Sequence, residues 1–140
     1  MISYDKFKSL LAEIILYSQT IEHDLKQIYA IIKPGLLAKN LEEIKNKPLG
    51  FIINELAELD STVSNPYIGQ DDYEFLRQMS YKRNYWVHKS FLEFIYLKDW
   101  EHTKEYDQVA KKLVAENNRF YDVYANLEQI RIQLYHDYRR

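Results

Sequence analysis

Residues 4–32 read YDKFKSLLAEIILYSQTIEHDLKQIYAII, and they indicate the fold class of the whole chain. Its apolar residues recur at steps of three and four positions, with charged residues between them: Phe7, Leu10, Leu11, Ile14, Ile21, Leu25, Ile28 and Ile32. That spacing predicts one long amphipathic helix with a single apolar face. We expect the helix to end at Lys33-Pro34-Gly35, because proline disfavours helical geometry in the residue before it and glycine readily ends a helix.

Further helices are predicted outward from this one. A short helix is expected from about Leu36 to Asn46. Pro48 fits the first position of a third helix that continues through Leu59, because the N–H that proline lacks is not needed there. Residues 60–69 predict the principal loop and the most mobile element, because they combine Asp, Ser, Asn, Pro and Gly.

Two longer helices complete the predicted fold. Asp71 or Asp72 can cap a fourth helix that runs to about Leu97. The last helix should start near Thr103 and carry apolar residues at helical spacing: Tyr106, Val109, Leu113, Val114, Phe120, Tyr124, Leu127, Ile130, Leu134 and Tyr138. Long helices with brief connections predict an all-α fold, an antiparallel bundle of four to five helices. The length of the chain fits one domain over residues 1–140.

The composition supports this prediction and excludes several classes of function. Only three glycines and three prolines among 140 residues leave little turn material for an all-β fold. The absence of cysteine excludes disulfides, thiolate metal sites and cysteine nucleophiles, and fits a reducing cytoplasm. Because there is no long apolar run and no signal-peptide pattern, we expect a soluble cytoplasmic protein that does not associate with membranes.

Charge is unevenly distributed along the chain. The formal net charge is −2, yet residues 77–98 contain five Lys or Arg against the single acid Glu93, a local balance of +4. A solvated charged face explains part of this excess, and a patch that contacts RNA is the other interpretation. Most of the thirteen tyrosines lie at apolar helical positions, which favours a place in the core over base stacking.

Arg83 stands out on a helical wheel of the predicted fourth helix. At about 100° per residue, Leu76, Val87, Phe91 and Phe94 fall within about 80° of Arg83, so the arginine lies in an apolar stripe. Burying a guanidinium without partners is costly. Arg83 must therefore reach water, an acid or a bound anion.

One edge of the stripe is polar. Four residues spaced by four, three and four positions form what we call the polar ridge: Arg77, Tyr81, Asn84 and His88. Two interpretations of Arg83 and the ridge are open. Arg83 can pair with Glu22 or Asp24 of the first helix while the ridge is simply solvated, or the arginine and the ridge together can bind a ligand.

A resemblance favours the second interpretation. Six consecutive residues carry it: Arg83, Asn84, Tyr85, Trp86, Val87 and His88. They resemble the signature of the HEPN superfamily, in which an arginine is followed directly by a small polar residue and, after four intervening residues in all, by a histidine. The order of long first helix, short middle helices, loop, motif helix and terminal helix is also similar to that family. The resemblance covers most of the chain and implies a HEPN-like bundle.

The resemblance implies a metal-independent endoribonuclease without a cofactor, whose two protomers form one cleft from their motif helices. His88 would be the general acid or base for attack of a ribose 2′-hydroxyl on the adjacent phosphate, which leaves a cyclic phosphate. Arg83 would neutralise charge on the phosphorane, and Asn84 would orient a phosphate oxygen or His88. These residue types suit the roles, because imidazole titrates near neutrality and guanidinium offers a fork of donors. The apolar stripe would be the dimer face.

Within this interpretation, Arg77 and Tyr81 are expected substrate contacts. The protein would be a homodimeric toxin or phage-defence effector, with an antitoxin or another regulatory protein as a possible partner. In HEPN toxins paired with a nucleotidyltransferase antitoxin, a tyrosine two positions after the histidine is modified; Ser90 stands there in this chain, so that regulation is not expected. Two alternatives are a non-catalytic HEPN module that binds nucleotide, RNA or a partner protein, and a helical adaptor whose motif match is coincidental.

No metal site is expected. The other histidines, His23, His102 and His136, lack the paired spacing of a zinc-binding helix. The run Glu22-His23-Asp24 could coordinate a cation only with ligands from elsewhere. No Gly-rich phosphate loop or nucleophile elbow occurs, which argues against nucleotide hydrolysis and serine chemistry.

Overall fold

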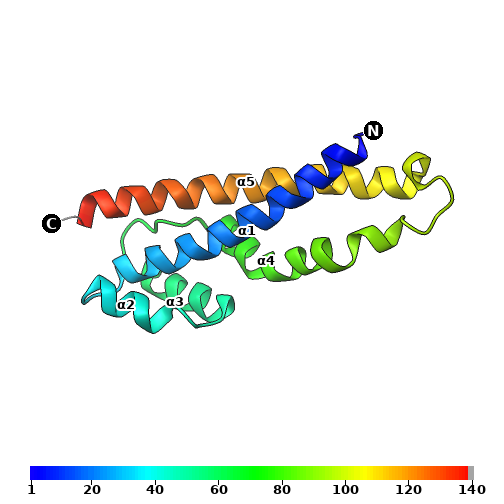
Figure 1. The fold of residues 1–140 in the computed structure, drawn as a ribbon. Coiled ribbons are helices and arrows are strands. Elements are labelled where there is room, and N and C mark those ends of the chain that lie inside the picture. The colour runs from blue at the N-terminus through cyan, green and yellow to red at the C-terminus, as the bar shows by residue number, and fades with distance from the viewer. Residues whose placement is uncertain (139–140) are drawn as a thin grey trace.

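The computed structural model describes residues 1–138 and confirms an all-α fold, with no strand in that range. Its elements in chain order are α1 (Tyr4–Ile32), α2 (Leu37–Ile44), α3 (Leu49–Ser61), α4 (Gln70–His88), the 3₁₀ turns η1 (Ser90–Glu93) and η2 (Trp100–His102), and α5 (Lys104–Tyr138). Figure 1 shows the three long helices α1, α4 and α5 lying along one another, with the short α2 and α3 beside one end.

The long helices α1 and α5 run parallel. Early residues of one helix contact early residues of the other, and late residues contact late ones. Asn117 Nδ2 donates to the Leu10 carbonyl at 3.0 Å, and Arg131 Nε lies 2.9 Å from the Asp24 carboxylate. The predicted antiparallel arrangement is therefore wrong for this pair. The reason is that the chain reverses twice between α1 and α5, once through α2 and α3 and once after α4.

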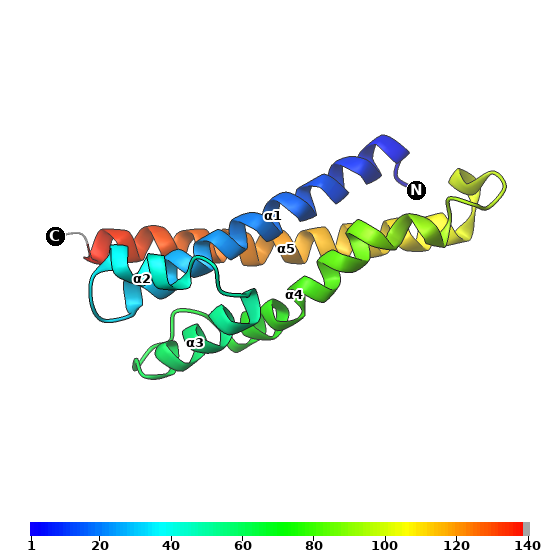
Figure 2. The same ribbon diagram turned by 60° about the horizontal axis from the view of Figure 1, so that its bottom comes forward.

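Helix α4 is antiparallel to both long helices, as predicted (Figure 2). Phe75 near its start packs on Phe120 of α5 with ring centroids 4.9 Å apart. Phe94, just beyond its end, packs on Tyr106 at 5.1 Å. Pairing early residues of one helix with later residues of the other defines opposite directions.

The boundaries of α1 match the prediction. Ser3 caps its first turn by accepting from the Lys6 N–H at 3.1 Å. Its end is closed by the buried Asn40, whose Nδ2 donates to the carbonyls of Ala30 and Lys33 at 3.1 and 3.0 Å. The turn that follows needs glycine, because Gly35 has φ +112°, a conformation that L side chains rarely adopt.

The short elements differ slightly from the prediction. Pro48 is the extended N-cap of α3 rather than its first helical residue, and α2 ends at Ile44 rather than Asn46. Gly69, not Asp71 or Asp72, is the N-cap of α4. The two aspartates lie inside the first turn, where their charge still favours the helix through its dipole.

The loop between α3 and α4 is tied down by one carboxylate. Asp60 is buried and accepts from the Tyr67 and Ile68 N–H groups at 2.8 and 3.1 Å and from the Tyr73 hydroxyl at 2.7 Å. The segment that the sequence marks as most mobile is therefore anchored to the ends of both neighbouring helices.

Helix α4 ends at His88, nine residues before the predicted Leu97. The chain turns there because two phenylalanines enter the core; Phe94, for example, packs 5.6 Å from Phe7. The wheel placement of Phe91 and Phe94 is consequently wrong. So is the prediction that the stripe forms a dimer face, since Leu76 and Phe94 are buried within their own chain and only Val87 is substantially exposed.

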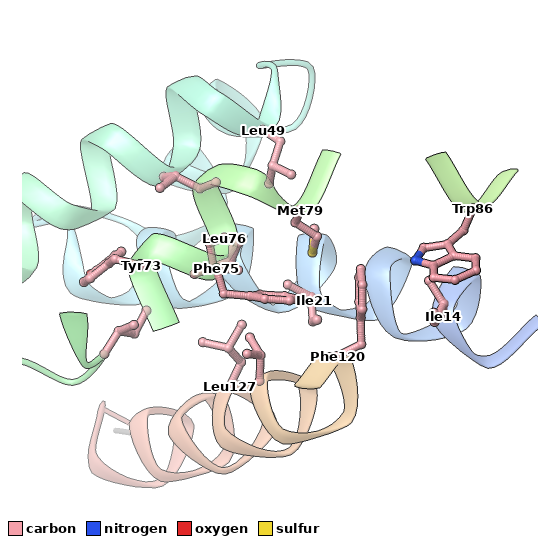
Figure 3. Packing of buried hydrophobic residues seen from close by; sticks show 14 of the residues in the cluster. Ile14, Ile21, Leu49, Tyr73, Phe75, Leu76, Met79, Trp86, Phe120 and Leu127 are labelled. Carbon is pink, nitrogen blue, oxygen red and sulfur yellow. The ribbon is translucent and has the colours of Figure 1, made fainter. Parts of the chain in front are cut away.

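The core lies between α4 and the α1–α5 pair (Figure 3). Helix α4 contributes Phe75, Leu76, Met79 and Trp86, which face Ile14 and Ile21 of α1 and Phe120 and Leu127 of α5. Each such side chain stabilises the fold by about 1.5–3 kcal/mol when fully buried. Trp86 and Met79 fix the rotation of α4 about its axis and so decide which residues remain outside. In residues 1–138, no helix has both the length and the apolar character needed to cross a bilayer.

Candidate functional site

The polar ridge is a continuous line of exposed side chains on α4. All four of its residues, Arg77, Tyr81, Asn84 and His88, are exposed to solvent, and Tyr81 has 78% of its surface exposed. Since a helix rises about 1.5 Å per residue, the ridge extends roughly 16 Å from its first to its last residue. The structure thus brings together four of the five predicted site residues in one accessible row.

Arg83, the fifth site residue, is only partly buried. Its side chain is 35% exposed, and its Nη1 lies 3.9 Å from Oε2 of Glu22. That distance allows an ion pair but no hydrogen bond. In residues 1–138 it is the only ion pair of Arg83, so most donors of this guanidinium face water rather than a protein acceptor.

The two acids proposed as partners of Arg83 have separate roles. Glu22 is the one that approaches the arginine. Asp24 is buried and lies 2.9 Å from Arg131 Nε and 3.3 Å from His23 Nδ1 instead. The prediction of an α1 acid beside Arg83 is therefore confirmed for Glu22 and wrong for Asp24.

His88 occupies the last turn of α4, and its neighbours hold that turn in place. The Lys89 N–H donates to the Tyr85 carbonyl at 2.9 Å, and Ser90 Oγ donates to the Trp86 carbonyl at 2.9 Å. The Tyr85 hydroxyl donates to Glu93 of η1. Burial, followed by this bond to a carboxylate, raises the pKa of Tyr85 above its ordinary value.

Trp86 anchors the motif helix to the core of the protein. Its side chain is completely buried, and Lys112 of α5 lies over the neighbouring Tyr85 ring at 4.0 Å from the centroid. The Trp86 indole Nε1 has no hydrogen-bond partner in residues 1–138. The motif thus has one buried anchor, Trp86, and exposed polar residues on the opposite side of the helix, Asn84 and His88.

Ser90 is buried and serves the backbone. Its hydroxyl satisfies the Trp86 carbonyl, which α4 leaves unpaired at its end. Ser90 therefore closes the end of α4, and the expectation that no modification occurs two positions after the histidine stays a prediction.

The positive charge around the ridge is only partly neutralised. Lys82 pairs with Glu116 at 3.5 Å, and Arg83 has its distant contact with Glu22. The other three cations of residues 77–98 have no carboxylate within 4 Å in the part of the chain that the structure describes: Arg77, Lys89 and Lys98. These three side chains are available to an external anion.

Arg77 borders a shallow hollow between α3 and α4. The hollow measures about 400 Å³; its lining is mainly apolar, from Leu49, Ile53 and Leu76, and Asn54, Ser80 and Arg77 are its polar members. Its polar wall adjoins the ridge, because Ser80 and Arg77 lie on consecutive turns of α4. This hollow extends the ridge toward the α3 side of the molecule.

The chemistry available here belongs to phosphate binding and proton transfer. The ridge and Arg83 offer guanidinium, amide, phenol and imidazole groups, which donate to phosphate oxygens or exchange protons. In residues 1–138, no three side chains of metal-binding type gather at one point. The run Glu22-His23-Asp24 divides, with Glu22 facing Arg83 and Asp24 facing Arg131.

Sequence reasoning missed the exposed residues that follow the motif. Leu92 and Tyr96 are exposed, Tyr96 to 85%. The neighbouring Phe91 and Phe94 point into the core instead. The three-residue spacing of Phe91 and Phe94 could have indicated these turns. It was overlooked because the same spacing also fits the α-helix that was predicted to continue to Leu97. A 3₁₀ turn has that period.

Comparisons of the chain with protein-family models, with curated proteins and with solved structures found no significant match. The interpretation of the site therefore depends on its own residues and geometry and on the resemblance of the motif.

Proposed function

We propose that this protein is a metal-independent endoribonuclease of the HEPN type, with a HEPN-like bundle. The observation that carries the proposal is the exposure of Asn84 and His88 in one row on α4, next to an Arg83 whose guanidinium has one carboxylate contact, at 3.9 Å. The Arg83 side chain is 35% exposed, so water reaches the donors that Glu22 leaves free. A phosphate oxygen can replace that water at the guanidinium.

Each residue has a role in the proposed reaction. His88 takes the proton of the ribose 2′-hydroxyl or returns one to the leaving 5′-oxygen, as the 2′-oxygen attacks the adjacent phosphorus and the phosphodiester breaks to a cyclic phosphate. Arg83 neutralises the charge that grows on the phosphorane oxygens, and Asn84 orients one of them. Arg77 and Tyr81 bind the RNA further along the ridge.

The proposed cleft contains two copies of the ridge. Because Leu76 and Phe94 are used inside the chain, the contact between protomers must be made by the outer side of α4, where Val87 lies beside Asn84 and His88. Light scattering should give a mass of twice the 17.0 kDa of one chain. A monomer at high micromolar concentration would contradict the shared cleft.

Cleavage of RNA in excess chelator tests the activity. We expect the wild type to cut, and both Arg83→Ala and His88→Ala to lose cleavage by at least about a hundredfold, as removal of a positioned acid–base or charge-stabilising group does. The matched controls are His102→Ala, which removes another exposed histidine, and Arg119→Ala, whose side chain is 38% exposed. Equal loss in all four variants would contradict the proposed roles.

One observation favours a second candidate, a non-catalytic module that binds RNA, a nucleotide or a partner protein. Glu22 approaches Arg83 and lowers the positive potential at the site. Under this alternative, wild type and His88→Ala bind RNA equally and neither cuts it. Under the leading proposal the protein acts as a cytoplasmic toxin or phage-defence effector, held in check by an antitoxin or another regulatory partner.

A further inference from the structure

We propose that three tyrosines on the seam between α1 and α5 bind an arginine side chain of a partner protein. They are Tyr17 of α1 and Tyr121 and Tyr124 of α5, and the carboxylates of Glu13 and Glu128 adjoin them. We call these residues the tyrosine site. The tyrosine site shares no residue with the polar ridge, so this inference does not depend on the proposed cleavage of RNA.

The three rings contact one another across the two helices. The Tyr17 ring lies 5.0 Å from the Tyr124 ring and 5.8 Å from the Tyr121 ring, measured between centroids. The two rings of α5 are 6.1 Å apart. Tyr17 and Tyr124 are partly buried, whereas Tyr121 has 50% of its surface exposed. The group therefore consists of two inner rings and one accessible ring at its edge.

The accessible edge of the site points away from the contact with α4. Phe120 of α5 packs on Phe75 of α4, with ring centroids 4.9 Å apart (Figure 3). At about 100° per residue, Tyr121 and Glu128 point about 100° and 80° away from Phe120, in the same rotational sense around α5. On α1, the neighbouring Leu16 is 59% exposed. This side of the α1–α5 pair is thus open to a partner and offers it apolar as well as aromatic surface.

Both carboxylates of the site lie beside its rings. The Tyr17 hydroxyl donates to Glu13 Oε2 at 3.0 Å. Glu128 lies one turn after Tyr124, and residues four apart are neighbours on a helix surface. The negative charge of Glu128, followed by burial, raises the pKa of Tyr124. The rings and the acids therefore form one cluster, and both acids are partly buried within it.

The cations of this region are already paired elsewhere. Residues 9–25 contain no Lys or Arg, and residues 113–130 contain only Arg119, which pairs with Asp72 at 3.1 Å. Arg131, just beyond, lies 2.9 Å from Asp24. Three acids of the two segments have no cation within 4 Å in residues 1–138: Glu13, Asp122 and Glu128. The surface keeps a negative charge that complements a cation from outside.

The rings also lack a cation of their own. Four other tyrosine rings have a Lys or Arg of this chain over them, at 4.0–5.8 Å from the centroid: Tyr4, Tyr29, Tyr73 and Tyr85. No such cation lies over the tyrosine site in the part of the chain that the structure describes. A guanidinium stacks on an aromatic face and its fork of donors matches a carboxylate, whereas an ammonium is a strongly hydrated point charge. Because arginine and tyrosine are enriched where proteins meet, a partner protein is the source of arginine that suits this open surface.

The test titrates ¹⁵N-labelled protein with a peptide of Gly-Arg repeats and, separately, with a peptide of Gly-Lys repeats. The arginine peptide should shift the amide signals of Tyr17, Tyr121 and Tyr124 and bind about threefold or more tighter than the lysine peptide. Tyr121→Ala should weaken binding of the arginine peptide about threefold or more, while Tyr121→Phe, which keeps the ring, should bind like the wild type. Glu128→Gln should weaken binding by about twofold or more.

Two matched variants control for loss of a ring and loss of a charge. Tyr96→Ala removes an exposed tyrosine outside the site, and Glu55→Gln removes a partly buried acid of α3 that has no cation within 4 Å in residues 1–138. Both should bind the arginine peptide like the wild type. Equal binding of the two peptides, or unchanged binding in Tyr121→Ala, would overturn the inference. A shift from dimer to monomer in Tyr121→Ala would show that a second copy of this chain covers the surface, and would also overturn it.

Discussion

Replacing Glu22 by glutamine tests how tightly the protein itself holds Arg83. The carboxylate lies 3.9 Å from the guanidinium, and the two side chains are 31% and 35% exposed. Two unit charges at about 4 Å attract by about 1 kcal/mol in water and more in a partly buried setting, while measured pairs of similar exposure contribute about 0.2–1 kcal/mol after their desolvation. The pair is therefore worth about 1 kcal/mol at most.

That magnitude sets the expected result for RNA binding. A phosphate that binds Arg83 competes with Glu22, so neutralising the acid should tighten binding of single-stranded RNA by up to about fivefold, which corresponds to about 1 kcal/mol. The free energy of unfolding should fall by less than about 1 kcal/mol. Fluorescence anisotropy of labelled RNA, in a His88→Ala background so that the RNA stays intact, gives the first quantity, and urea denaturation gives the second.

The matched control is Glu43→Gln, which makes the same change in net charge. Glu43 pairs with Lys33 at 2.9 Å just beyond the end of α1. Lys33 lies eleven residues after Glu22, about 16 Å along the helix axis, which exceeds the Debye length of about 8 Å at physiological salt. The control should therefore leave RNA affinity unchanged. Weaker RNA binding in Glu22→Gln, or a loss of stability above about 2 kcal/mol, would contradict the expected competition with phosphate and identify the pair as structural.

Two further predictions concern the scaffold that positions the site. Asp60→Ala removes the acceptor of three hydrogen bonds at 2.7–3.1 Å, and bonds to a charged group contribute about 1.5–3 kcal/mol each. Because such losses are not additive, we expect a destabilisation of about 3 kcal/mol or more in urea, and a loss below about 1 kcal/mol would contradict the role of Asp60 as the anchor of the loop. Burial, with the hydrogen bond to Glu13 next, raises the pKa of Tyr17 from 10.0 to about 12. The folded value is the higher one, so this contribution to stability is complete below pH 10 and is lost as the pH rises toward 12. Tyrosinate absorbance should show a group of tyrosines, Tyr17 among them, ionising late in the folded protein. The amplitude of this late phase should fall by about one tyrosine in Tyr17→Phe, and the whole delay should disappear in urea.

The sequence contained most of the fold and only part of the site. Helical periodicity placed α1 correctly from Tyr4 to Ile32, because one apolar face against α5 determines it. The same reasoning extended α4 to Leu97, since periodicity alone cannot show that Ser90 ends the helix and that Phe94 enters the core. Periodicity also could not predict the relative direction of α1 and α5, because whether these helices are parallel depends on how α2 and α3 reverse the chain.

At the site, residue spacing along the sequence predicted the arrangement of side chains correctly where the helix is regular. The ridge from Arg77 to His88 lies within α4, so its exposure followed from the wheel. Glu22 was predicted together with Asp24, and only the structure separates them, because Arg131 of α5 approaches Asp24. Tyr96 was missed for the opposite reason, since it lies in turns whose geometry the wheel does not describe.

The most direct test of the central claim is the chemistry of the RNA ends left by the protein in excess chelator. Because the neighbouring 2′-hydroxyl is the proposed nucleophile, we expect fragments ending in a 2′,3′-cyclic phosphate and no cleavage next to a 2′-deoxy nucleotide. We also expect these ends to vanish in Arg83→Ala and His88→Ala. Intact RNA with the wild type, 3′-hydroxyl ends, or cyclic ends that persist in both variants would contradict the claim that the α4 ridge cuts RNA.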